Sequence, residues 1–143
     1  MIAGIVRSIS AACLLALGSL VGGCSKGFAW DGEWQGNHHL PIKNGENPYL
    51  INTLGQVTLT IKGDRFDMKE AGVPISGSVR FDDKKAFLKI ETRFDRPIEK
   101  EPLEVQKQMK EIELTGNSDG TASFKDPGGF LPEAVVLSKS GRS

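Results

Sequence analysis

The side chains best suited to bind a metal ion or a polar ligand fall in one segment, residues 36–55. His38 and His39 are the two histidines of the chain, and Tyr49 is its one tyrosine. Adjacent residues on a strand point to opposite faces, so the two imidazoles could converge on a metal ion only within an irregular loop. No third ligand follows at a zinc-like spacing. We therefore expect exposed loop histidines and no metal site. Because long loops are often functional, His38, His39 and Tyr49 are the candidate ligand-binding residues.

The other polar side chains form no catalytic motif. Most carboxylates fall in predicted turns or on the polar side of predicted strands, and no pair is spaced for acid–base catalysis. The serines lack a nucleophile-elbow motif, and no glycine-rich phosphate loop precedes a helix. We expect no catalytic residue and a protein that is not an enzyme.

Composition excludes further classes. The chain has 143 residues, and its 18 Lys and Arg balance its 18 Asp and Glu, so the formal net charge is zero. A general nucleic-acid binder needs a basic surface, so we expect no nucleic-acid partner. The length fits one domain, and two cysteines are too few for a disulfide framework or a Cys/His zinc cluster.

The first 23 residues have the composition of an export signal. Arg7 is their one charged residue, and the run from Ile9 to Val21 carries no charge. As a helix this run spans about 20 Å, which is too short for the ~30 Å hydrocarbon core of a bilayer. The pattern indicates that residues 1–23 are a secretory signal peptide rather than a transmembrane anchor.

The end of this signal resembles the lipobox of bacterial lipoproteins, where an aliphatic residue and two small ones precede a cysteine: Val21-Gly22-Gly23-Cys24. The resemblance implies cleavage before Cys24 and lipid attachment to its thiol, as a diacylglycerol thioether with further fatty acyl groups. We expect no other cofactor, and membrane lipid as a partner through the anchor, because two or three acyl chains bind a bilayer firmly. An ordinary secretory signal with an incidental cysteine is the alternative.

The same resemblance gives a location in the bacterial cell envelope. Ser25 stands where an Asp would signal retention at the inner membrane, which implies the outer membrane if the source is Gram-negative. Residues 24–29 would form the lipidated N-terminus and a short tether. The five residues between Cys24 and Trp30 reach about 17 Å, so the folded domain would sit close to the membrane.

Alternation of apolar and polar residues predicts short β-strands in the rest of the chain. The clearest pattern is a hairpin, in which residues 56–62 and 65–69 flank the turn Gly63-Asp64. A helical period predicts one short helix, over residues 102–110. Further strands are predicted over residues 30–35, 76–81, 85–94, 111–115, 121–125 and 134–138.

About eight strands in one domain, residues 30–143, predict an all-β fold. Closing antiparallel strands into an up-and-down barrel removes exposed sheet edges, and a two-sheet β-sandwich is the alternative. Eight strands leave room for packed side chains or for one small ligand. The residues expected to point inward are bulky, which favours a filled interior that binds partners by its rim or loops: Phe66, Met68, Phe81, Phe94 and Phe124.

Gly32-Glu33-Trp34, at the start of the first predicted strand, is similar to the Gly-x-Trp motif of lipocalins and related calycin barrels. In that family the tryptophan plugs the closed end of the barrel, and a basic side chain after the last strand packs across its ring. The resemblance implies these roles for Trp34 and for Lys139 or Arg142. It also implies a long first loop, residues 36–55, over the open end. The Thr-Asp-Tyr-type motif of the family is missing, and a small barrel of another kind is the alternative.

Together these features predict a lipid-anchored envelope β-barrel with a ligand-binding or protein-interaction role. Its partner would be a small apolar ligand, which needs a cavity, or an envelope protein. An inhibitor of an envelope-directed hydrolase such as lysozyme is an alternative, because residues 76–81 resemble the Ser-Gly-x-x-Tyr stretch of small inhibitory lipoproteins. An enzyme of unknown type is the weakest alternative.

Overall fold

The computed structural model describes residues 27–125 and 133–141. The predicted signal peptide, the lipobox with Cys24, and Arg142 lie outside the described residues. The strands are β1 (Gly32–Asn37), β2 (Gln56–Lys62), β3 (Arg65–Glu70), β4 (Val73–Asp82), β5 (Lys85–Arg93), β6 (Arg96–Pro97), β7 (Glu111–Gly116), β8 (Ala122–Phe124) and β9 (Val135–Lys139).

Three helical segments accompany these strands: α1 (Pro48–Gly55), the short 3-10 turn η1 (Ile98–Lys100) and α2 (Leu103–Gln108). The helix expected over residues 102–110 is present as α2, whereas α1 was not expected. Neither α1 nor α2 is long and apolar enough to cross a membrane, nor is any other helix in the described part of the chain.

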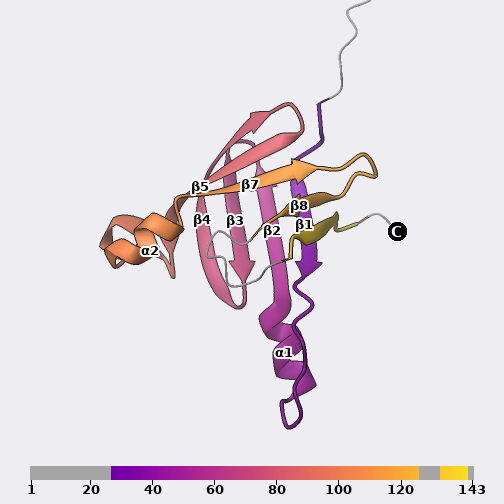
Figure 1. Ribbon diagram of the computed structural model, residues 1–143. Helices are drawn as coiled ribbons and strands as arrows, with labels where there is room; N and C mark the ends of the chain where they lie inside the picture. The colour runs from indigo at the N-terminus through magenta and orange to yellow at the C-terminus, as the bar shows by residue number, and fades with distance from the viewer. Residues whose placement is uncertain (1–26, 126–132, 142–143) are drawn as a thin grey trace, which may run out of the picture.

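Eight of the described strands close into one antiparallel up-and-down barrel (Figure 1). Each strand pairs with the next along the chain, apart from the two-residue β6, which extends only the edge of β5. The ring is completed where β1 pairs with β9, with Trp34 opposite Lys139. The predicted barrel is therefore confirmed, and the sandwich alternative is wrong because hydrogen-bonded pairing continues around the whole ring.

Side chains from all eight barrel strands are buried in the described interior and form one apolar cluster. The alternation of apolar and polar residues along the strands produces this core, since every second residue of β2 and β3 is buried. Trp34, Phe66, Met68 and Phe124 lie in this core, as expected. The other buried apolar residues are Trp30, Val57, Leu59, Ile61, Ile75, Val79, Ala86, Leu88, Ile90, Ile112, Leu114, Ala122, Val135 and Leu137.

Two of the phenylalanines expected inside the barrel are not buried. Phe81 is 43% exposed, because it lies at the end of β4, where its ring stacks on Trp30 with centroids 6.4 Å apart. Phe94 is 49% exposed, because β5 ends at Arg93 and the backbone of Phe94 turns to a φ of 49°, which interrupts the alternation. Phe87, on the outer face, packs under the Arg80 guanidinium, whose carbon lies 4.1 Å from the ring centroid.

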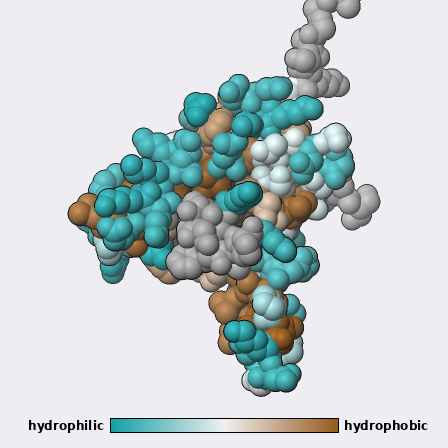
Figure 2. Space-filling model, viewed as in Figure 1, coloured by the Kyte–Doolittle hydropathy of each residue, from teal (hydrophilic) through white to brown (hydrophobic). Residues whose placement is uncertain are grey.

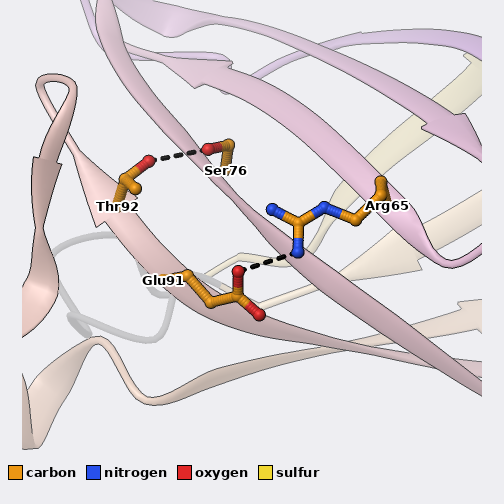
Figure 3. Close-up of polar contacts among 4 residues, drawn as sticks. All are labelled: Arg65, Ser76, Glu91 and Thr92. Atoms are coloured by element: carbon orange, nitrogen blue, oxygen red, sulfur yellow. Dashed lines mark hydrogen bonds and ion pairs between the residues drawn. The ribbon is translucent and has the colours of Figure 1, made fainter.

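The pairing of β4 with β5 contains a register shift between Ser76 and Gly77. A Cβ atom at Gly77 would collide with the carbonyl oxygen of Lys89 on β5, so only glycine allows this close approach. On the outer face, polar contacts join β3, β4 and β5 (Figure 3). Ser76 Oγ lies 2.6 Å from Thr92 Oγ1, and Arg65 Nη1 donates across β4 to Glu91 Oε2 at 2.8 Å.

Candidate functional site

The two ends of the barrel are built differently, and strand register assigns each segment to one of them. Gly32 of β1 pairs with Ile61 of β2, while Asn37 pairs with Gln56. Residues 27–31, which enter β1 at Gly32, therefore lie at one end, called here the N-terminal end. The segment that joins β1 to β2, residues 38–55, lies at the other, called here the arm end (Figure 1).

Aromatic rings close the N-terminal end. The Trp34 ring nitrogen donates to the Trp30 carbonyl oxygen at 2.8 Å. Phe28 stacks 5.8 Å from the Trp34 ring, although it lies in the stretch expected as a tether. Lys139 Nζ lies 5.2 Å from the Trp34 ring centroid and donates to the Ala29 carbonyl oxygen at 3.0 Å. The structure thus brings together Trp34 and Lys139, the pair that the lipocalin resemblance implies.

At the arm end, residues 38–55 project from the barrel as an arm that includes α1 (Figure 1). The helix begins where the Asn47 side chain accepts a hydrogen bond from the Tyr49 backbone nitrogen at 3.0 Å, with Pro48 in the first helical position. Asparagine at the N-cap and proline at the first position are both favoured at helix starts. The helix ends where Gln56 becomes extended and starts β2.

The base of the arm is fixed to β1. The His38 backbone nitrogen donates to the Gly55 carbonyl oxygen at 2.7 Å, and the Asn37 side chain donates to the Asn52 carbonyl oxygen at 3.3 Å. A Cβ atom at Gly55 would collide with the His38 carbonyl oxygen, so the helix returns to the sheet in close contact with β1. The arm is therefore attached at a defined position, although its outer part has little contact with the barrel.

The outer part of the arm exposes apolar side chains. Tyr49 is 80% exposed, and Leu50, Leu54 and Ile42 are also largely in solvent. From Asn47 to Gln56 the chain carries no charged side chain. Figure 2 shows apolar colour gathered on the arm, in contrast to the mainly hydrophilic wall of the barrel above it. The arm does not cover the core, so the expectation of a loop over the open end does not match this arrangement.

The candidate ligand-binding residues do not form one site. His38 is only 6% exposed, so the expectation of an exposed loop histidine is wrong for this residue. The reason is that His38 continues the inward alternation of β1 after Trp34, and its Nε2 lies 2.8 Å from Glu70 Oε1. His39 and Tyr49 are exposed, and no hydrogen bond or ring contact joins them to His38. No cluster of metal-ligating side chains occurs within residues 27–125 and 133–141.

Sequence reasoning missed two features of this end. The contact between His38 and Glu70 joins residues 32 positions apart, and it depends on where β1 and β3 end. The apolar residues of the arm were also missed, although Asn47-Pro48 is a recognisable start signal for the helix that displays them.

The stretch that resembles inhibitory lipoproteins, residues 76–81, lies within β4. All of it pairs with β5, and residues 76–78 also pair with β3, so its backbone is not a protruding loop that could enter a partner's active site. Comparison of the chain with family models, curated proteins and solved structures finds no match. Any functional assignment therefore depends on the sequence features and the geometry described above.

Proposed function

We propose that this protein is a lipid-anchored component of the bacterial cell envelope that binds a protein partner through the arm. The observation that carries this proposal is the exposed apolar surface of α1 at the end of the barrel opposite residue 27. The anchor is inferred from the lipobox ending at Cys24, and the barrel serves as the rigid body that holds the arm.

The apolar cluster inside the barrel favours binding of a partner at the arm over binding of a ligand inside the barrel. Ligand pockets are usually concave and partly empty, about 300–1,000 Å³ in volume. Here the interior of the described barrel is occupied by side chains of all eight strands. A small apolar ligand would have to share the interior with this cluster, whereas a partner at the arm needs no rearrangement of the core.

The arrangement of α1 suits a groove on another protein. Leu50 and Leu54 are four residues apart, so they share one face of the helix. Helices recognised in grooves present apolar anchors at this spacing, and contiguous exposed apolar surface commonly marks an interaction site. Tyrosine is enriched among residues that dominate binding energy, which makes Tyr49 a natural anchor beside them. Because α1 has no charged side chain, the complex should depend little on salt.

In-cell photo-crosslinking tests this proposal. A photoreactive phenylalanine analogue is placed at Tyr49 and, as the control, at Val136, which is 53% exposed on the barrel wall. We expect a discrete adduct with an envelope protein from position 49 and none from position 136. Leu50→Ser together with Leu54→Ser should abolish the adduct. The same adducts from both positions, or an adduct that survives the double substitution, would contradict the proposal.

A further inference from the structure

A second apolar feature lies at the N-terminal end, far from the arm. A cleft of about 360 Å³ opens beside residues 27–31 and the turn after β4. Phe28 and Trp30 line it, with ring centroids 4.4 Å apart, and Phe81 adds a ring that is 43% exposed. The remaining lining residues are Gly27, Ala29, Asp31 and Asp83. Of these three rings, Phe81 is exposed, Phe28 is half-buried and Trp30 is buried.

The Trp30 indole N–H lacks a hydrogen-bond acceptor among the described residues. A buried N–H without an acceptor costs free energy. The residue is only 5% exposed. Trp30 therefore forms the floor of the cleft, and the half-buried Phe28 and the exposed Phe81 supply its accessible apolar surface.

The sequence limits how far this end can be from a lipidated Cys24. Two residues, Ser25 and Lys26, separate Cys24 from Gly27, and the three steps between the Cα atoms cover about 10 Å in a fully extended chain. The polar headgroup layer on each side of a bilayer is about 5–8 Å thick. An anchor at Cys24 therefore holds Phe28, four residues further on, within about 14 Å of the lipidated residue, which allows its ring to reach the headgroups.

We propose that this aromatic face docks on the bilayer, with Phe81 and Phe28 in the lipid interface and Trp30 packed behind them, so that the barrel stands on its N-terminal end. The inference rests on the lipid anchor of the proposed function and adds an orientation to it. Docking of this end would point the arm away from the membrane, because register places α1 at the opposite end of β1 and β2.

The charge at this end gives no preference for anionic lipid over zwitterionic lipid as the docking surface. A surface selected for anionic lipid carries an excess of lysine and arginine. Here the residues of the turns and strand ends balance: Lys62, Arg65, Lys84, Lys85 and Lys139 against Asp31, Asp64, Asp82, Asp83 and Asp119. The contact should therefore depend on apolar burial, and it should change little with salt or with anionic lipid content.

Tryptophan fluorescence provides the test, because both tryptophans of the chain, Trp30 and Trp34, lie at this end. The protein is purified with its natural N-terminus, its intact mass is measured, and it is reconstituted into phosphatidylcholine vesicles with or without bromine atoms on the acyl chains. We expect the brominated lipid to quench the fluorescence. Phe81→Ser should lose about half of the quenching, whereas Phe81→Leu should keep most of it, because the leucine still buries apolar surface.

The matched control is Phe94→Ser, which removes a phenylalanine of similar exposure at the arm end. It should be quenched like the wild type. Equal fluorescence in brominated and plain vesicles for a lipidated protein would overturn the docking and leave the anchor intact. Equal losses for Phe81→Ser and Phe94→Ser would overturn it as well. An intact mass without lipid on Cys24 would instead contradict the anchor, and with it the distance argument.

Discussion

His38 and its neighbour His39 lie in different environments. The His38 side chain is buried against Glu70 and lies edge-on to the Phe124 ring, with centroids 6.2 Å apart, while His39 is exposed. The two histidines therefore form a natural pair for comparison, since they share a residue type and a position in the chain.

We predict that His38→Ala lowers the free energy of unfolding by about 1–3 kcal/mol, because it removes a buried hydrogen-bond partner and leaves a cavity. His39→Ala should change it by less than about 0.5 kcal/mol, as is usual for exposed positions. Urea denaturation of both variants measures the difference. Equal effects would mean that His38 does not occupy the buried site described.

Gly77 gives a second prediction at the scale of one residue. Gly77→Ala places a methyl group against the Lys89 carbonyl oxygen at the bulge between β4 and β5, which should cost about 1–3 kcal/mol of stability. Gly45→Ala is a useful comparison, because a Cβ atom there meets nothing within 4 Å, although its φ of 91° adds backbone strain. Thermal unfolding of the two variants should place Gly77→Ala lower, and the reverse order would argue against the close approach.

At the scale of elements, alternation identified the strands of the barrel correctly, because each strand has one face in the core and one in water. Val57, Leu59 and Ile61 are a clear example, since all three are buried within β2. The same reasoning failed where strands end. Phe94 keeps the inward position in the pattern, but its positive φ takes it out of the strand, and sequence alone does not locate such a turn.

The candidate site was predictable only in part. The segment that contains His39 and Tyr49 stands out in the sequence, because a connection of this length is unusual in a hairpin, and its role as a binding segment stays a prediction. The sequence analysis expected polar ligand-binding side chains in this segment, whereas the structure also exposes the apolar side chains of Leu50 and Leu54 there. Whether such leucines are buried or exposed depends on where the arm points, and that is set by contacts at its base, such as that between His38 and Gly55.

The hydrogen bond between Arg65 of β3 and Glu91 of β5 predicts that the stability of the protein depends slightly on pH in the acid range. The hydrogen bond from Arg65, with a second from Ser78, holds the pKa of Glu91 below its usual range. A depressed carboxyl pKa contributes stability above the ordinary glutamate value of about 4.3, and this contribution is lost as the pH falls through the pKa of the folded state. Both side chains are more than a third exposed, so the contribution stays below about 1 kcal/mol.

Denaturation curves at neutral pH and near pH 3 measure this effect. The wild type should lose more stability between these conditions than Glu91→Gln, by less than about 1 kcal/mol, and high salt should shrink the difference. Arg65→Gln should act in the same way as Glu91→Gln, and combining the two should add nothing. Additive losses in the double variant would show that the two residues act separately.

At the scale of the whole molecule, the barrel separates two apolar surfaces. Phe28, Trp30 and Phe81 lie at one end, and the arm projects from the other (Figure 1). The wall between them is mostly hydrophilic on the face seen in Figure 2. This polarity fits a protein held at a membrane by one end while the other end meets a partner, which is the arrangement proposed above.

The central claim is that Cys24 carries the lipid that gives the molecule this orientation. Metabolic labelling with a fatty-acid probe tests it most directly, on the wild type, Cys24→Ala and the matched control Cys13→Ala, which changes the other cysteine of the chain. The account predicts label in the wild type and in Cys13→Ala, and its loss in Cys24→Ala. An unlabelled wild type, or label that persists in Cys24→Ala, would contradict it.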